Sequence, residues 1–218
     1  MGQTAIEKVL ARTSGRERVT PGDIVVCQVD RAVLLDMQFS STAVPWRQPL
    51  VVADPTRVAV VLDHGSPAPS RRDAEGHRLA RQFCDRFGVA DFFDIGRHGI
   101  CHQIIAENGL ARPGELLLCS DSHTCAGGAF NTAARGVGGI EMLQIACTGS
   151  TWFVAAASIK VTLIGELGPS VEGKDAFLAL ARDHGSAENR NLEFVGSGVT
   201  GLSLHDRRTI ATQCAEIN

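Results

Sequence analysis

The chain has 218 residues, of which 44% are hydrophobic, and a formal net charge of −3. This composition suffices for one full domain and part of a second, and the lack of basic excess excludes a protein that binds nucleic acid through a basic surface. Residues 1–11 lack the apolar stretch of a secretory signal. We therefore expect a cytoplasmic globular protein with no nucleic-acid partner.

The chain holds seven cysteines, an odd number, and no two of them have the spacing C-x-x-C. Without a secretory signal, this usage indicates reduced thiols. The uncharged run from Met142 to Ile159 approaches the length of a membrane span, but polar residues such as Gln144 and Thr148 interrupt it. The run therefore predicts a buried helix followed by a loop, and no membrane partner.

The first part of the chain alternates between strand and helix patterns. Thr4 and Glu7 form a capping box, which predicts a helix through Ala11. Ser70 is the expected start of a helix that Gly88 ends. The other expected elements, in chain order, are a strand over 23–29, a buried strand over 57–64, a strand over 90–95, a short helix over 99–109 and a strand over 113–120.

The remainder continues the alternation, with a strand over 159–167 and a helix over 173–185. Ser203 opens a last helix that lacks a terminating glycine or proline. The alternation predicts an α/β fold with a parallel-rich sheet. The glycine-rich and proline-containing segment 165–173 is the expected boundary between a first domain over 1–165 and the beginning of a second over 166–218.

Two acid–histidine clusters directly follow apolar strands. They are Asp63 with His64, and Asp121 with Ser122 and His123. A single such residue after a strand is usually a loop residue or a cap, but ligands in open α/β sheets gather beyond the carboxyl ends of strands. An aspartate beside a histidine favours the protonated imidazole, which can act as a general acid. The two clusters together predict a site.

The segments GICHQIIAENGL, DSHTCAGGAFNTAARGVGG and TGSTWF, at 99–110, 121–139 and 148–153, closely resemble the aconitase superfamily. The resemblance is strongest to the N-terminal half of the large subunit in its isopropylmalate dehydratase and homoaconitase branch, and it runs from Thr4 to Glu216. It implies a three-layer α/β/α domain followed by the start of a second, similar domain.

The resemblance implies a [4Fe–4S]-dependent hydro-lyase that isomerises hydroxy di- or tricarboxylic acids, isopropylmalate-like ones above all, in amino-acid (leucine) biosynthesis. Histidine–carboxylate pairs surround the departing hydroxyl in that family. The matching catalytic positions here are Asp63 with His64, Asp121 with His102, and His123 with Glu216, and Ser122 matches a hydroxyl that contacts substrate.

The same comparison shows what this chain lacks. The family's three cluster cysteines lie beyond the matched region, and none of the seven cysteines present takes their role. The substrate-binding arginines and the serine base belong to later segments or to a small swivel-domain subunit. We therefore expect a chain that stops within the second domain and acts with a missing C-terminal segment or chain and with that subunit.

Two positions depart from the family pattern, and other functional classes stay open. Leu35 replaces a polar group expected to face the substrate, and Thr212 replaces an asparagine.

The main alternative is a truncated or pseudoenzyme relative that binds a partner without turnover. A serine hydrolase is a weaker alternative, because the chain lacks the G-x-S-x-G motif of that class. A mononuclear metal hydrolase would draw its ligands, in a spacing that fits no standard zinc pattern, from Cys101, His102, Cys119, His123 and Cys125.

Overall fold

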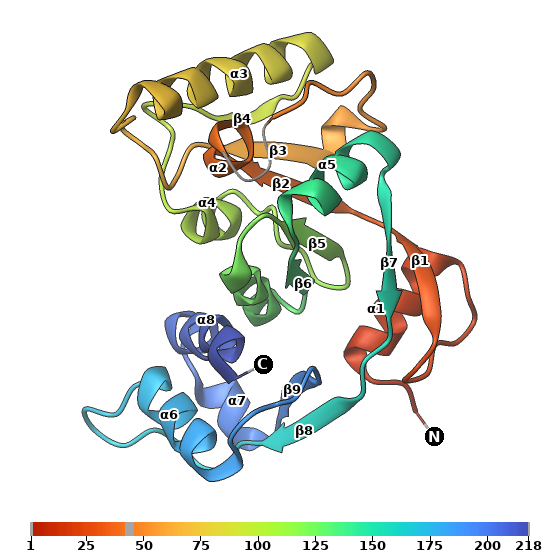
Figure 1. The fold of residues 1–218 in the computed structure, drawn as a ribbon. Coiled ribbons are helices and arrows are strands. Elements are labelled where there is room, and N and C mark those ends of the chain that lie inside the picture. The colour runs from red at the N-terminus through yellow and green to blue at the C-terminus, as the bar shows by residue number, and fades with distance from the viewer. Residues whose placement is uncertain (1, 42–45, 218) are drawn as a thin grey trace.

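The computed structural model describes residues 2–41 and 46–217 (Figure 1). The strands are β1 Ile24–Gln28, β2 Arg31–Leu35, β3 Val58–Val61, β4 Asp91–Phe93, β5 Leu116–Cys119, β6 Ala133–Gly136, β7 Ser150–Val154, β8 Ser158–Thr162 and β9 Asn191–Val195. The α-helices are α1 Ala5–Ser14, α2 Asp36–Ser40, α3 Arg71–Phe87, α4 Cys101–Glu107, α5 Gly139–Thr148, α6 Gly173–His184, α7 Ser197–Gly201 and α8 Leu204–Gln213. Short 3₁₀ helices are η1 Pro55–Arg57, η2 Ser122–Phe130 and η3 Cys214–Ile217.

The centre of the fold is a five-stranded sheet with the order β4-β3-β2-β5-β6. Every pairing within it is parallel. The central strand β2 sets the register, with Val33 opposite Cys119 of β5 and Leu35 opposite Val61 of β3. The parallel α/β fold that the sequence predicts is confirmed.

The central strands β2, β3 and β5 are buried on both faces, which explains why they read as continuous apolar runs. Alternate residues of β2 enter two separate apolar clusters, Ala32 and Leu34 in one and Val33 and Leu35 in the other. Residues of α1, α3 and α5 belong to the first cluster and residues of α4 to the second. Helices thus cover both faces (Figure 1), and the expected three-layer α/β/α arrangement is confirmed.

The predicted helix ends are present in the structure. Thr4 and Glu7 form a reciprocal capping box at the start of α1. Ser70 and Ser203 accept hydrogen bonds from the backbone N–H groups three residues ahead at the starts of α3 and α8. Gly88 ends α3 in the left-handed conformation, with φ 68°, which glycine adopts without a steric cost.

Five strands differ from the expectation: β1 and β7 in their placement and pairing, and β2, β6 and β9 because no strand was predicted there. β1 lies outside the main sheet and pairs antiparallel with β7, in the segment expected to be a loop. Its residues alternate between exposed and buried, the pattern of a strand with one covered face. The sequence analysis also missed the central strand β2, because an apolar run this short does not distinguish strand from helix by periodicity.

The last part of the chain forms its own parallel pair, β8 with β9, and α6, α7 and α8 lie together on one side of it (Figure 1). β8 precedes residue 165, whereas its partner β9 follows it. α8 packs against η2 at the edge of the main sheet. Among the described residues, no helix is both long enough and apolar enough to cross a membrane.

Candidate active site

The predicted site residues meet at the carboxyl edge of the main sheet. Asp63 and His64 follow β3, and Asp121, Ser122 and His123 follow β5. Because β3 and β5 are parallel and both flank β2, their carboxyl ends lie at the same edge. The helix α4 adds His102, and η3 adds Glu216 from the other end of the chain.

The best-buried contact of the site joins His102 to Asp121. His102 Nε2 lies 2.7 Å from Asp121 Oδ1, and the side chains are only 16% and 11% exposed. Burial by itself lowers the pKa of His102, but the hydrogen bonds to Asp121 and Cys101 outweigh it and raise the pKa to about 9. The hydrogen bond from His102 lowers the pKa of Asp121 to about 2 against the opposing effect of its burial. At neutral pH this pair is an imidazolium–carboxylate ion pair.

Asp121 also lies close to the two other histidines of the site, His64 and His123. Its Oδ1 accepts a hydrogen bond from the backbone N–H of His123 at 2.8 Å and lies 3.8 Å from Nδ1 of the same residue. Its Oδ2 lies 3.5 Å from His64 Nε2. A single carboxylate therefore has three histidine side chains, those of His64, His102 and His123, within 3.8 Å.

His64 lies between two carboxylates without a short hydrogen bond to either. Its Nδ1 is 3.6 Å from Asp63 Oδ2, and its Nε2 is 3.5 Å from Asp121, distances too long for good hydrogen bonds. Asp63 Oδ2 instead accepts the backbone N–H of Cys101 at 2.8 Å, at the first residue of α4. The His64 side chain is 41% exposed, so an incoming molecule can reach it.

The pair between His123 and Glu216 faces solvent. His123 Nε2 lies 2.8 Å from Glu216 Oε1, with side chains 37% and 56% exposed. Ser122 Oγ lies 3.3 Å from His123 Nδ1. The three pairs implied by the resemblance are thus in contact, and Ser122 lies beside them. Their catalytic roles remain predictions.

The docking of α8 brings Glu216 to the site. Arg208 of α8 donates a 2.7 Å hydrogen bond to Gln103 Oε1 on α4 and lies 3.5 Å from the carbonyl oxygen of His102. Cys125 Sγ contacts the carbonyl oxygen of Thr212 at 3.5 Å. The sequence analysis missed Arg208, because nothing in the local pattern of an exposed helix reveals a partner 105 residues away.

One expectation about an individual residue was wrong. Leu35 does not line the site, because its side chain is fully buried in the apolar cluster between the sheet and α4. The glycines near 127 and 136 serve close packing within the protein. A Cβ at Gly136 would lie 2.3 Å from the Asp121 carbonyl oxygen, and one at Gly127 would lie 2.7 Å from Ala134 Cβ.

The chain's own residues do not fit an iron–sulfur cluster. The described residues contain no group of three or more histidine, cysteine, aspartate or glutamate side chains that could hold a metal ion. Cys101 and Cys119 are fully buried, and the contact with Cys119 together with burial raises the pKa of the Cys101 thiol far above its usual value. Metal binding requires thiolates, so these thiols are poor ligands. The same geometry disfavours the mononuclear metal alternative.

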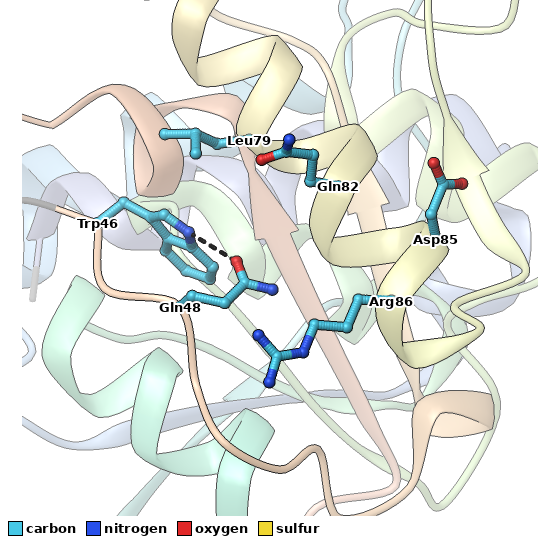
Figure 2. Close-up of a pocket in the computed structure, with 6 residues that line it drawn as sticks. All are labelled: Trp46, Gln48, Leu79, Gln82, Asp85 and Arg86. Carbon is cyan, nitrogen blue, oxygen red and sulfur yellow. Dashed lines mark hydrogen bonds between the residues drawn. The ribbon is translucent and has the colours of Figure 1, made fainter.

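A separate surface hollow of about 740 Å³ lies between α3 and the segment that carries Trp46 and Gln48 (Figure 2). Trp46 Nε1 donates a 3.2 Å hydrogen bond to Gln48 Oε1 within it. Its lining contains none of the predicted site residues. The lining residues are Trp46, Gln48, Leu79, Gln82, Asp85 and Arg86.

Comparison with known proteins shows the family to which this chain belongs. A family model described as "Aconitase family (aconitate hydratase)" matches residues 19–218, so the chain belongs to the aconitase family. Enzymes of this family use [4Fe–4S] clusters.

Among the relatives, the 3-isopropylmalate dehydratase large subunit of Mycolicibacterium smegmatis is 56% identical over all of this chain and 51% of its own length. The 3-isopropylmalate dehydratase large subunit 1 of Methanopyrus kandleri is 36% identical over all of this chain and 52% of its own length. A probable methanogen homoaconitase large subunit of Methanothermobacter thermautotrophicus is 35% identical over 97% of this chain and 51% of its own length. The chain spans about half the length of the curated relatives it matches.

Proposed function

We propose that this chain is part of a hydro-lyase that removes water from, and returns it to, hydroxy di- or tricarboxylic acids of the isopropylmalate type. The observation that carries the proposal is the convergence of three histidine–carboxylate pairs around Asp121 at the carboxyl edge of the sheet. Membership of the aconitase family and the printed names of the relatives support the same class of reaction.

The reaction needs a proton at the departing hydroxyl. In dehydration, the C–O bond and a C–H bond on the adjacent carbon break, a C=C bond forms, and the hydroxyl leaves as water. The base that takes the proton of the C–H bond lies outside this chain in the proposal. A protonated imidazole beside that hydroxyl supplies the proton, and the same group takes it back on rehydration. His64 and His123 suit this role because both side chains are substantially exposed and each lies beside carboxylates.

His102 has a different role in the proposal. With a pKa of about 9 it holds its proton too firmly for efficient transfer near neutral pH. Its charge keeps Asp121 ionised, and its hydrogen bond fixes the direction of that carboxylate. His102 and Asp121 therefore form a fixed ion pair, and the accessible side chains of His64 and His123 lie around its carboxylate.

The iron–sulfur cluster lies outside this chain in the proposal, because the cysteines here do not form a ligand set. A further segment equivalent to the second half of the relatives would supply the ligands, and a small swivel-domain subunit would complete the substrate site. A cytoplasmic setting, which keeps thiols reduced, is part of the same proposal.

The test joins this chain to the second half of the Mycolicibacterium smegmatis relative and adds the small subunit of that enzyme. Isopropylmalate, homocitrate and citrate are the substrates, and formation of the unsaturated acid is followed by ultraviolet absorbance. We expect turnover of at least one acid. His123→Ala and Asp121→Asn should lower turnover by about a hundredfold or more, whereas the matched control His98→Ala, outside the site, should not.

The alternative is a non-catalytic relative. It would replace the proposal if the joined protein folds, carries a full cluster and still converts none of the three acids, while the intact relative is active under the same conditions. Equal losses of folding and activity in the two site variants would return both residues to a structural role.

A further inference from the structure

Asp36 and His77 form a second buried polar pair, next to the backbone of His64. Asp36 is 2% exposed and His77 is 4% exposed, and His77 Nε2 lies 3.8 Å from Asp36 Oδ2. Asp36 follows β2, the strand between β3 and β5, so it ends a strand in the same way as Asp63 and Asp121. The proposed reaction does not use either residue.

The Asp36 carboxylate is bound by the backbone that carries His64. Its Oδ1 accepts the N–H of His64 at 3.2 Å, and its Oδ2 accepts the N–H of Gly65 at 2.6 Å. Oδ1 also accepts the N–H of Met37 at 3.0 Å. Burying a carboxylate costs several kcal/mol unless such donors compensate it, so this arrangement holds the turn after β3 in one conformation.

The element that carries Asp36 is itself fixed. At Gly76 of α3, an added Cβ would lie 2.8 Å from Ser40 Cβ, so α2 and α3 touch closely there. His77 follows Gly76 and faces the carboxylate, and Ser66 Oγ lies 3.4 Å from His77 Nε2. An added Cβ at Gly65 would lie 3.2 Å from Asp36 Oδ2, which shows how closely the turn approaches the carboxylate.

We propose that Asp36 is a positioning residue that holds the backbone of His64 and Gly65 so that the His64 imidazole lies between Asp63 and Asp121. His64 has no short hydrogen bond of its own to either carboxylate. The turn to which Asp36 binds therefore determines where the imidazole lies. The inference rests on the proposed function, since the position of His64 matters to catalysis only if the site is an active site.

The first test uses the full 218-residue chain and the variant Asp36→Asn. Asparagine keeps one acceptor oxygen but presents an NH₂ group to the other backbone N–H, so one of the two bonds to the turn is lost. We expect the ring ¹⁵N signals of His64 to shift and the amides of His64 and Gly65 to lose protection from hydrogen exchange. The ring signals of His98, whose Nδ1 accepts the N–H of Gly96, should stay in place.

A matched control separates positioning from general destabilisation. Asp94→Asn breaks the two-bond contact of that carboxylate with Arg81 on α3, outside the His64 turn. It should lower stability without moving the His64 signals. Unchanged His64 signals in folded Asp36→Asn, or equal shifts in both variants, would overturn the proposal.

A second variant decides the question if Asp36→Asn does not fold. Gly65→Ala leaves the Asp36 charge in place and pushes the turn away from Oδ2 by a few tenths of an ångström, at a residue whose φ is not in the left-handed region. The His64 ring signals should move here as well. If they stay in place in folded Gly65→Ala, the proposal is wrong.

An activity measurement in the joined enzyme follows. Asp36→Asn should lower kcat by about a hundredfold with little change in KM, because small misplacements of a reacting group have effects of this size. If kcat is unchanged although His64 moves, the positioning role in catalysis is wrong. If the joined parent enzyme is inactive, the proposed function fails, and the NMR result still decides whether Asp36 positions His64.

Discussion

The pairs His102–Asp121 and His123–Glu216 have almost the same N–O distance, 2.7 and 2.8 Å, in very different surroundings. The side chains of the first pair are 16% and 11% exposed, and those of the second are 37% and 56% exposed. Water and salt compete for both partners of the second pair, whereas the first is largely shielded. Distance alone therefore does not describe what such a pair contributes.

The difference in exposure suits the two pairs to different roles in one site. The buried pair fixes a charge, since the pKa of His102 is raised to about 9 and that of Asp121 is lowered to about 2. The exposed pair leaves the His123 ring accessible to a substrate. In the proposed hydro-lyase, the first pair would supply the fixed charge and the second an accessible proton donor.

The largest expected effect is a pH dependence of stability due to His102. Its pKa of about 9 in the folded protein exceeds the ordinary histidine value of 6.5, so its contribution to stability is complete below pH 6.5 and is lost as the pH rises through about 9. The free energy of unfolding should fall by about 3 kcal/mol over this range. Urea unfolding at closely spaced pH values measures it. His102→Gln should remove this component and His123→Gln should not, and the comparison fails if both behave alike.

Next in size is the loss of the buried carboxylate. Asp121→Asn should lower the free energy of unfolding at pH 6 by about 2 kcal/mol, because it leaves the His102 imidazole without its charged partner in a largely buried position. Chemical denaturation of both proteins in one buffer gives the difference. The control Asp183→Asn removes an exposed carboxylate paired with Arg182 and should have little effect. Equal costs for the two variants would contradict the role assigned to burial.

A smaller effect follows from loosening α8 without touching the exposed pair. Arg208→Met keeps the aliphatic stem but removes the donor to Gln103, and it should cost about 1 kcal/mol. Because α8 leads to Glu216, the His123 ring ¹⁵N signals should also shift. Arg207→Met is the matched control, since within the described residues the hydrogen bonds of Arg207 go to carbonyls between residues 199 and 202. An unmoved His123 in the Arg208 variant would mean that α8 docking does not hold the exposed pair.

The smallest effect concerns the exposed pair itself. Glu216→Gln should change the free energy of unfolding by no more than about 0.5 kcal/mol, and less in high salt, since an exposed ion pair contributes little. Thermal unfolding at two salt concentrations checks this. A cost close to that of Asp121→Asn would show that the two pairs are energetically alike.

Many helix ends and strands were predictable because their sequence signals are local. The capping box at Thr4, the helix start at Ser70 and the left-handed glycine at position 88 each act within one turn of a helix. The strands that precede Asp63 and Asp121 were also recognisable, because strands buried on both faces read as apolar runs. The strand β7 was missed, since its partner β1 lies more than a hundred residues earlier in the chain.

The predictions for single side chains depended on how far the relevant contact lies along the chain. Leu35 was expected to face the substrate because the matching position in the family does so. In the structure its side chain instead lies in the apolar core beneath α4. Asp36, one residue later, carries a polar group toward the His64 turn. Successive residues where a strand passes into a helix face different directions, and sequence alignment does not show which faces the site.

By itself, the sequence determined the α/β class, the helix ends and the placing of acids and histidines after buried strands, because these depend on local conformational preference and on hydrophobic pattern. Only the tertiary structure decided that Asp121 is shared among three histidines and that Glu216 reaches His123, 93 residues away. It alone also decided that His102 is shielded while His123 is open. These properties arise from the packing of α4 and α8 around η2, and burial is a property of packed elements that no local pattern contains.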